Sequence, residues 1–512
     1  MKILIFHGYL LRGTGSNIYN ANLASALAGL GHDVHLLCQD LDAEKLDWVN
    51  RVGTWDESGL SVEEFRAPSG DGSVTVYRPP IGALLPVYVE DPYEGFEARA
   101  FPRLSDAEIE NYIDVNVSAV HDVLDLIGGH GVALANHLIM GPVIFARAGV
   151  RPYAVKNHGS DLEYTVKPNS ERFVPYAQEG LEPAAAVLVG SHHTAASLWE
   201  AIPGLDLESK TGMGPPGVDT EEFHSIPRDE AIGQLGRLAE EIGNGPPSAV
   251  FGRDEEEAVT ALGEYASATG PRVVFVGKLI VSKGVDLLAA AWPVVHAANP
   301  GARLLFIGFG AYEVGMRALV TAIGEGDLEA MDHIAEEGRG LEGDESHRLA
   351  YLSAFLDDLP AGYREAAIAS AGSISFAGRL EHDEVAQVLP ASDAMVVPST
   401  FPEAFGMVAA EGAACGVLPV CAEHSGLAEV TTTLSDEVPA AAGLTGFRLG
   451  PEAVPDLAAR INGWLALEPA ERLGIGRDIA ASADRNWSWR GVAADVISAS
   501  AGEVRPVARP HD

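Results

Sequence analysis

The segment FPEAFGMVAAEG, residues 401–412, decides how this chain is interpreted. It is short of charge, yet it places Glu403 ahead of a glycine and Glu411 further on, inside an apolar run typical of a helix. Because a carboxylate has two acceptor oxygens that suit a diol, we expect these two acids to bind hydroxyl groups of a ligand. The alternative stays open at this point: Glu403 begins a helix and Glu411 is a solvated helix residue.

The residues around these acids predict a phosphate site between them. The preceding run DAMVVPS reads as a buried strand that ends at Ser399, so Glu403 lies in the loop at its carboxyl end. Gly406 permits close approach of the backbone to a ligand just before the helix. Unpaired amides at a helix N-terminus attract phosphate oxygens through hydrogen bonds and the helix dipole.

Apolar runs alternate with helix-like segments along the whole chain. KILIFHG, SNIYNANLASALAGLG and DVHLLCQ begin the pattern, and PRVVFVGK, GVDLLAAAWPVVHAANP and ARLLFIGFG resume it after residue 270. Continuous apolar strands separated by helices predict parallel sheets that are covered on both faces. The pattern therefore indicates an α/β chain with two doubly wound, Rossmann-like domains in series.

The domain boundaries follow from Pro, Gly and charge patterns. We expect a first domain over 1–217, ending at the Pro- and Gly-rich TGMGPPGVDTEEF, and a second over 218–470. Acidic insertions near 225–270 and 324–372 interrupt the second domain, the first partly loop and the second largely helical. Residues 471–512 are predicted to form C-terminal helices that return to the first domain and to fray at the end.

Composition excludes several classes of partner. The 512 residues include 34 Lys and Arg against 73 Asp and Glu, a formal net charge of −39. Nucleic acid is therefore not an expected partner, and electrostatic docking on an anionic membrane is disfavoured.

The longest apolar stretch contains Asn136, His137 and Arg147, so we expect no transmembrane segment. The N-terminal run predicts a strand rather than a signal peptide, and the three cysteines lack metal-ligand spacing; we expect a cytoplasmic protein.

Three cations stand at predicted strand ends. Lys278 ends PRVVFVGK, Lys283 precedes the helix that begins GVDLL, and Arg379, with Leu380 beside it, ends SISFAGRL. Ligands of open parallel sheets bind outside the carboxyl ends of the strands. The two lysines are therefore expected to clamp a diphosphate, with surface lysines as the alternative. The Arg379 guanidinium would reach a phosphate, and the backbone beside it a nucleotide base.

The chain resembles the retaining, nucleotide-sugar-dependent glycosyltransferases of family 4, also called glycosyl transferases group 1. The resemblance is carried by the E-x7-E pattern in EAFGMVAAE, then CGVLPVCAEHSGLAEV, VGKLIVSKG, SFAGRL, PPGVDTEEF and the glycine-bearing N-terminal loop. It covers nearly the whole chain apart from the acidic insertions. It implies the GT-B fold: two Rossmann-like domains that face each other across a cleft, with a C-terminal helix crossing back to the first.

The implied activity is transfer of a hexose from a nucleoside-diphosphate sugar to a hydroxyl of a sugar, polyol or glycan, in carbohydrate biosynthesis. The co-substrate would be a UDP-, ADP- or GDP-sugar, with no permanently bound cofactor and no required metal, because lysines and amides neutralise the diphosphate. The base, the sugar, the acceptor and the oligomeric state stay open, and so do a lipid-linked acceptor and contact with a membrane surface.

The resemblance also implies roles for the donor side. Glu403 would contact hydroxyls of the donor sugar, and Glu411 the ribose. Lys278 and Lys283 would neutralise the leaving group. Lys278 departs from the family, which more often has arginine there; a lysine keeps the charge but loses the planar fork. The sugar and diphosphate pocket would be lined by Phe405, Gly406, Met407 and Val408.

On the first domain the resemblance implies a loop and two histidines. The segment RGTGSNIYN would bring its backbone near the diphosphate and the acceptor at Gly13 and Gly15. His137, in ALANHLIMG, is the better candidate for a histidine near the donor sugar, with a structural role as the alternative. The acceptor side would include Asn17, Tyr19, His158 and Asp161.

Three other functions compete with this one. A nucleotide-sugar epimerase or a phosphorylase would use the same architecture, and donor turnover without an acceptor, or a need for free phosphate, would reveal it. A non-catalytic sugar-nucleotide binding protein would bind without turnover. A nicotinamide-dependent dehydrogenase is disfavoured, because Ile18 stands where the dinucleotide fingerprint requires its third glycine.

Overall fold

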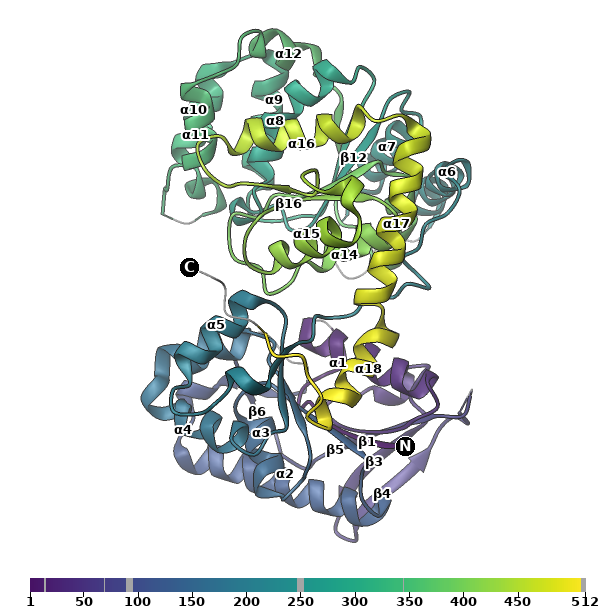
Figure 1. Cartoon of the computed structure of the whole chain (residues 1–512), viewed down its shortest axis with the longest axis vertical. Helices are drawn as coiled ribbons and strands as arrows, with labels where there is room; N and C mark the ends of the chain where they lie inside the picture. The colour runs from purple at the N-terminus through teal and green to yellow at the C-terminus, as the bar shows by residue number, and fades with distance from the viewer. Residues whose placement is uncertain (13–14, 69, 89–94, 246–252, 344, 508–512) are drawn as a thin grey trace. The chain divides into compact units, whose positions relative to one another are not determined.

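The computed structural model describes residues 1–12, 15–68, 70–88, 95–245, 253–343 and 345–507 (Figure 1). The chain divides into two compact units. The first contains residues 1–217 and 487–512, and the second contains residues 218–486. The segment that returns to the first unit therefore starts at Trp487, whereas the sequence pattern places that start at residue 471.

The sheet of the first unit is parallel apart from one antiparallel hairpin, β3–β4. Within the described ranges its nine strands lie in the order β11 (Thr211–Met213), β10 (Ala186–Val189), β9 (Ala154–Lys156), β8 (Val132–Asn136), β1 (Lys2–Phe6), β2 (Asp33–Leu37), β5 (Ser73–Arg78), β3 (Arg51–Asp56), β4 (Gly59–Glu64). A separate parallel pair joins β6 (Leu84–Val87) to β7 (Glu97–Ala100). The chain order reverses beside β1, which lies between β2 and β8; this is the switch point of the sheet.

Both faces of this sheet are buried because successive side chains of a strand point to opposite sides. In β1, Leu4 and Phe6 join one apolar core, and Ile3 and Ile5 join the other. The first core is closed by α2 (Asp106–Ile127), α3 (Met140–Arg147), α4 (Ser170–Leu181) and α5 (His192–Ala201). The second core is closed by α1 (Gly15–Gly29) and α18 (Trp489–Ser500). A return of the C-terminus to the first sheet thus completes its second face.

The second unit has a fully parallel sheet. In its described part six strands lie in the order β14 (Ile374–Phe376), β13 (Arg303–Ile307), β12 (Arg272–Val276), β15 (Ala394–Val397), β16 (Leu418–Ala422), β17 (Gly446–Phe447). Its switch point lies between β12 and β15. Outside the acidic insertions, the helices of this unit include α8 (Val285–Ala298), α13 (His382–Val388), α14 (Met407–Ala414), α15 (Ser425–Glu437), α16 (Ala453–Leu465) and α17 (Pro469–Trp487). The prediction of doubly wound parallel sheets is confirmed.

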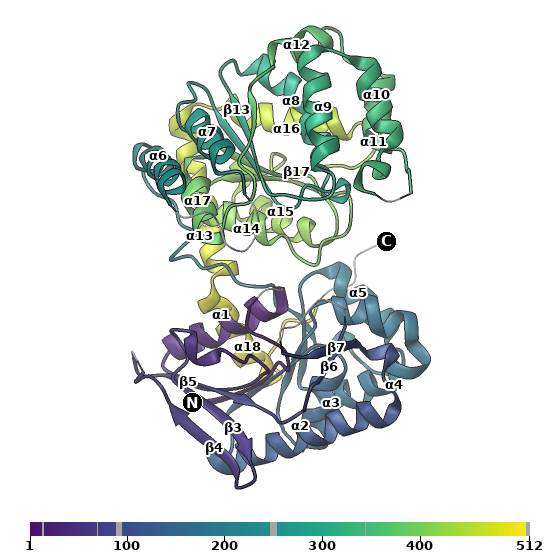
Figure 2. The ribbon, with the colours of Figure 1, turned by 180° about the vertical axis from the view of Figure 1, so that it is seen from behind.

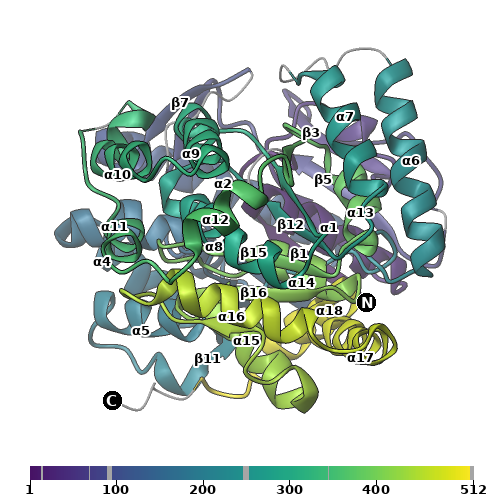
Figure 3. The same ribbon diagram turned by 90° about the horizontal axis from the view of Figure 1, so that it is seen from above.

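The acidic insertions form helical layers on this unit. In the first, α6 (Arg228–Asn244) and α7 (Glu255–Ala266) lie side by side (Figure 3). The second follows α9 (Glu313–Glu325) and contains α10 (Leu328–Glu337), α11 (Ala350–Asp357) and α12 (Tyr363–Ala369); α9, α10 and α11 are neighbours in Figure 2. Among the residues that the structure describes, no helix is both long and apolar enough to cross a membrane.

Candidate functional site

Polar side chains gather at the carboxyl edge of each sheet, beside its switch point. In the first unit they follow β1 and β8; in the second they follow β12 and β15. In open parallel sheets this is where ligands bind, because the loops on either side of the switch point diverge. Each edge was built independently by its own unit, and the two edges carry different chemistry.

In the second unit, the loops after β12 and β15 are joined by their backbones. The first loop ends in the short helix η6 (Val281–Lys283), and the Thr400 N–H of the second donates to the Ser282 carbonyl at 2.9 Å. Gly284 follows with φ of 65°, and a Cβ there would lie 2.0 Å from the Pro398 carbonyl oxygen. Only glycine therefore permits this approach, which brings Lys283 to the second loop. Lys278, at the start of the first loop, is exposed.

Lys283 and Glu403 form an ion pair between these loops. The Lys283 Nζ contacts Glu403 Oε1, and the Ser399 hydroxyl donates to the same oxygen at 2.6 Å. Their side chains are 30% and 23% exposed, so the pair is half-buried and open to a ligand. Two residues with separate roles in the sequence hypothesis thus share one charged contact.

The start of α15 holds the Glu403 loop in place. The Glu403 N–H donates to the Ser425 hydroxyl, and the Glu403 carbonyl accepts from the Gly426 N–H, both at 2.8 Å. His424 Nε2 lies 2.7 Å from the Ser399 carbonyl oxygen. Sequence reasoning assigned no role to His424 or Ser425, although their segment AEHSGLAEV carries part of the resemblance. The resemblance of that segment to the family was the sequence signal that could have pointed to these two residues.

Helix α14 begins beside the same loop without a side-chain cap. The N–H groups of its first turn, which includes Met407 and Val408, therefore have no intrahelical acceptor and point out of the helix end. A Cβ at Gly406 would lie 2.8 Å from Leu427, so this glycine lets the loop pack on α15. Packing against α15, and not only approach of a ligand, favours a glycine at position 406. Phe405 and Leu380, both predicted pocket residues, are buried.

Glu411 lies on the second turn of α14 and is buried, with an 8% exposed side chain. Its Oε1 is 3.1 Å from His382 Nε2, and His382 Nδ1 is 3.5 Å from a Glu222 carboxylate oxygen. The hydrogen bond with Glu411 raises the pKa of His382, which burial opposes. The alternative of a solvated Glu411 is wrong, because the side chain is buried against an imidazole that sequence reasoning did not single out.

Arg379 lies at the tip of β14, where the sequence places it. Its Nη2 is 3.3 Å from Glu381 Oε2, and its guanidinium lies 5.8 Å from the centre of the Phe309 ring. Phe309 is itself 41% exposed at the tip of β13. The arginine therefore stands over an exposed aromatic ring at the carboxyl edge of the same sheet, beyond the edge strand β14 and its neighbour β13.

The edge of the first unit is a buried cluster around His137. This residue follows β8 with φ of 68°, and its side chain is 3% exposed. The rings of His158 and Tyr88 lie 4.9 and 4.6 Å from its own. Neither ring nitrogen has a hydrogen-bond partner among the described residues, and Asp161 Oδ1, 4.0 Å from Nδ1, also lacks one. Buried groups without partners are costly, so this cluster is a candidate place for a bound molecule that supplies the missing hydrogen bonds.

Other predicted residues of the first unit support this cluster. Asn17 is buried and contacts His7 Nε2 at 2.9 Å, and the buried Tyr19 ring packs against His158. His158 Nε2 lies 2.8 Å from Asn136 Oδ1. Gly15 is exposed at the start of α1, and Gly13 lies outside the described residues.

Burial controls the charge of this edge. It lowers the pKa of His7 to about 3, helped by the neighbouring His137, and it lowers the pKa of His158 well below the usual range. Burial also lowers the pKa of Lys156 to about 7; the Lys156 Nζ donates to the Gly214 carbonyl at 2.7 Å. His7 and His158 are therefore neutral at neutral pH, and their rings offer hydrogen bonds rather than charge.

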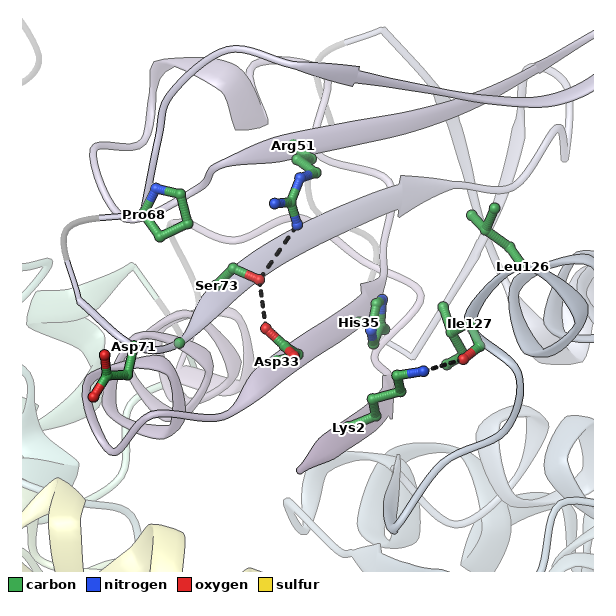
Figure 4. Close-up of a pocket in the computed structure, with 10 residues that line it drawn as sticks. Lys2, Asp33, His35, Arg51, Pro68, Asp71, Ser73, Leu126 and Ile127 are labelled. Atoms are coloured by element: carbon green, nitrogen blue, oxygen red, sulfur yellow. Dashed lines mark hydrogen bonds between the residues drawn. The ribbon is translucent and has the colours of Figure 1, made fainter.

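A pocket of about 350 Å³ lies elsewhere, at the amino edge of the first sheet (Figure 4). Its cations are already engaged: Lys2 donates to the Ile127 carbonyl, and Arg51 pairs with Glu64 at 2.9 Å. Figure 4 shows Arg51, Ser73 and Asp33 joined in a row by hydrogen bonds. The pocket therefore has little free charge for an anion.

Comparison with known proteins points to sugar transfer. Residues 366–476, which contain Arg379, Glu403 and Glu411, match the model of the family described as glycosyl transferases group 1. The chain is 26% identical over 325 residues to a GDP-mannose-dependent monoacylated alpha-(1-6)-phosphatidylinositol monomannoside mannosyltransferase of Corynebacterium glutamicum, covering 60% of this chain and 67% of that protein. It is 27% identical over 246 residues to a glycogen synthase of Mycobacterium tuberculosis, covering 47% of this chain and 46% of that enzyme.

Among solved structures, the chain is similar to Anabaena HepE in complex with UDP and glucose, with a TM-score of 0.52 and 17% identity. That match covers 96% of this chain and 97% of the other. The predicted two-domain GT-B fold is confirmed by such neighbours. Together with the family model, they support the group 1 family of GT-B glycosyltransferases.

Proposed function

We propose that this protein is a retaining glycosyltransferase of family 4. It would transfer a sugar from a nucleoside-diphosphate sugar to a hydroxyl acceptor, with the second unit binding the donor and the first the acceptor. One observation carries the proposal: the half-buried Lys283–Glu403 pair stands at the switch point of the second sheet, between joined loops. A pair of opposite charges in that place is suited to a ligand with both phosphate and hydroxyl groups.

Donor binding rearranges this pair. The Lys283 ammonium moves from the carboxylate to the diphosphate, where the first-turn amides of α14 and the exposed Lys278 add positive potential. Glu403 is then released to accept hydrogen bonds from the sugar hydroxyls. Glu411 keeps His382 on one oxygen and accepts from the ribose diol with the other. The exposed Phe309 ring and Arg379 flank the nucleotide base.

The reaction breaks the bond between the anomeric carbon and the diphosphate oxygen. The acceptor hydroxyl attacks the same face of the sugar, which retains the configuration, and its proton passes to the leaving diphosphate. The products are the glycoside and a nucleoside diphosphate. Negative charge grows on the leaving group, and Lys283 and the α14 amides stabilise it more strongly than in the ground state. No enzyme carboxylate is needed as a nucleophile.

His137 provides the contact of the first unit with a sugar. Among the described residues neither of its ring nitrogens has a partner, so a substrate hydroxyl placed there satisfies a buried group that otherwise destabilises the fold. Asp161 stands 4.0 Å from Nδ1 and favours the tautomer that carries a proton on that nitrogen. The Nε2 atom then accepts a hydrogen bond from the sugar.

The donor is the first point to test. The relatives point to different nucleotides: one is named for GDP-mannose, and the HepE structure holds UDP and glucose. Calorimetric titration with UDP, ADP and GDP, and then with the matching sugar nucleotides, would identify the donor. We expect selective binding of one diphosphate that is weakened in both Lys283→Ala and Glu411→Ala. Folded wild-type protein that binds none of them would refute the proposal.

The turnover assay separates the competing functions. We expect the chosen sugar nucleotide to lose its sugar to a hydroxyl acceptor, without free phosphate and with the anomeric configuration retained, as product NMR would show. Unchanged rates in EDTA would support neutralisation by lysines and amides. Epimerised donor would indicate an epimerase, and tight binding without turnover would indicate a binding protein.

A further inference from the structure

The two acidic insertions, residues 225–270 and 324–372, have no role in the function proposed so far. Each nevertheless sends one side chain to a loop at the carboxyl edge of the second sheet. These contacts come from Glu342 of the second insertion and Arg253 at the edge of α7 in the first. Both are hydrogen bonds to backbone groups of the loops that carry the donor-site residues.

Glu342 holds the turn that carries Lys283. It ends the short helix η7 (Arg339–Glu342), and its Oε1 accepts the N–H of Val281 at 2.7 Å. Val281 is the first residue of η6, whose last residue is Lys283. The first N–H groups of a helical turn have no internal acceptor, so a carboxylate there both satisfies a donor and fixes the turn.

The η7 turn is itself anchored, so it can transmit position. Its backbone is tied to the helix before it, because the Gly338 N–H donates to the Ile334 carbonyl of α10 at 2.9 Å. The Leu341 N–H closes the turn onto the Gly338 carbonyl at 3.1 Å. A carboxylate carried by an anchored turn holds its partner more firmly than one carried by an unanchored segment, because less conformational entropy is lost when the hydrogen bond forms.

Arg253 likewise holds a loop of the site, the one that carries Arg379. Its side chain is 7% exposed, and its Nη1 donates to Glu384 Oε2 at 2.7 Å and to the Arg379 carbonyl at 3.3 Å. Glu384 in turn accepts the Glu381 N–H and closes the capping box of α13. Helix α13 begins at His382, the partner of Glu411. One buried guanidinium therefore supports both the Arg379 tip and the start of α13.

We propose that the insertions are positioning elements of the donor site, an inference that rests on the proposed function. Glu342 sets the phosphate end by fixing η6 and Lys283. Arg253 sets the nucleoside end by fixing Arg379 and the His382–Glu411 contact. The ligand class that both serve is a nucleoside diphosphate, and neither residue touches it.

The division between the two ends can be measured. Using the full chain, we would titrate the preferred nucleoside diphosphate and the corresponding nucleoside monophosphate into Glu342→Ala, Glu342→Gln and the control Glu336→Ala, an exposed acid on α10. We expect Glu342→Ala to weaken diphosphate binding roughly tenfold, with a smaller effect on the monophosphate, because one charge-assisted hydrogen bond is lost. Glu342→Gln keeps an acceptor oxygen and should recover part of the loss, whereas Glu336→Ala should match wild type.

Arg253→Met is the counterpart, and it should weaken both nucleotides to a similar extent. A double variant tests transmission through the lysine: if Glu342 acts by placing Lys283, Glu342→Ala should change binding little in a Lys283→Ala background. If Glu342→Ala and Lys283→Ala weaken nucleotide binding independently, so that their effects multiply in the double variant, the inference is overturned. Wild-type binding in folded Glu342→Ala and Glu342→Gln would overturn it as well. Wild-type protein that binds no nucleoside diphosphate would instead refute the proposed function, and this inference with it.

Discussion

The switch points of the two sheets have the same topology and opposite chemistry. In the first unit the strand tips carry imidazole, amide and phenol groups that are buried, and the His137 ring and one Asp161 oxygen have no partner among the described residues. In the second unit the tips carry a half-buried ion pair, Lys283–Glu403, and an uncapped helix end. A parallel sheet provides the place for a ligand, and the residues at its strand tips decide which ligand.

The difference is one of charge and solvent. Burial removes the charge from His7 and His158 by lowering their pKa values, so we expect the first edge to recognise neutral hydroxyl groups. The second edge carries the partly exposed Lys283–Glu403 ion pair, and we expect it to neutralise a diphosphate. The predictions below test whether the two edges divide the work in this way.

The largest effect is expected from removing the lysine of the charged edge. Lys283→Ala should lower kcat/KM by roughly 10²–10³, the size typical of losing one stabiliser of developing charge. Steady-state kinetics with the identified donor, together with calorimetry on the nucleoside diphosphate, would measure it. Lys283→Arg keeps the charge and should retain more activity. A Lys283→Ala enzyme with normal kcat/KM would remove the charged edge from catalysis.

Glu403 should behave differently from its partner. Glu403→Gln should lower turnover by about 10²-fold, because hydrogen bonds to the donor sugar are weakened in the transition state. Binding of the nucleoside diphosphate alone should stay unchanged or tighten, since Lys283 no longer has a competing carboxylate. Parallel kinetics and calorimetry on this variant would check both results. Equal losses in both would mean that Glu403 serves only to hold the loop.

Burial acts on an acid in the second unit, with a consequence for stability. It raises the pKa of Asp286 in α8 to about 7, so between about pH 4 and pH 7 the folded chain holds a proton that the unfolded chain has lost. Its contribution to stability is therefore present at low pH and lost as the pH rises through 7. Asp286→Asn should raise the free energy of unfolding at pH 8 by on the order of 2 kcal/mol, and change it little at pH 4.

Chemical denaturation of Asp286→Asn and wild type at the two pH values would measure this difference. His7 sets the opposite expectation in the first unit: its lowered pKa removes stability as the pH falls below about 6.5. Equal stabilisation of Asp286→Asn at both pH values would show that the burial of the acid does not govern its charge.

The smallest effect is expected at the neutral edge. His137→Asn keeps a side chain that tolerates positive φ and should lower sugar transfer about tenfold, the effect of losing one hydrogen bond. Binding of the nucleoside diphosphate should not change, because that ligand belongs to the charged edge. Calorimetry and initial rates would separate the two. Weakened diphosphate binding in a folded His137→Asn protein would break the division between the edges.

Much of the charged edge was predictable because its residues follow strands. Lys278, Lys283, Arg379 and Glu403 each stand after an apolar run, and a parallel sheet brings all such positions to one edge. His382 was not predictable, because its contact with Glu411 depends on how α13 packs. Ser425 was missed for a similar reason: its hydroxyl meets the Glu403 N–H only when α15 packs on the loop.

By itself the sequence determined the alternation of buried strands and helices, the parallel character of both sheets, and the strand tips at which polar residues stand. Those properties depend on side-chain periodicity and on residues close along the chain. Only the tertiary structure decided which of these residues meet. Lys283 reaches Glu403 because Gly284 lets two loops touch, and Glu342 reaches Val281 because an insertion folds back on the sheet. Such contacts join segments far apart in the chain, and their geometry comes from packing, which no local pattern encodes.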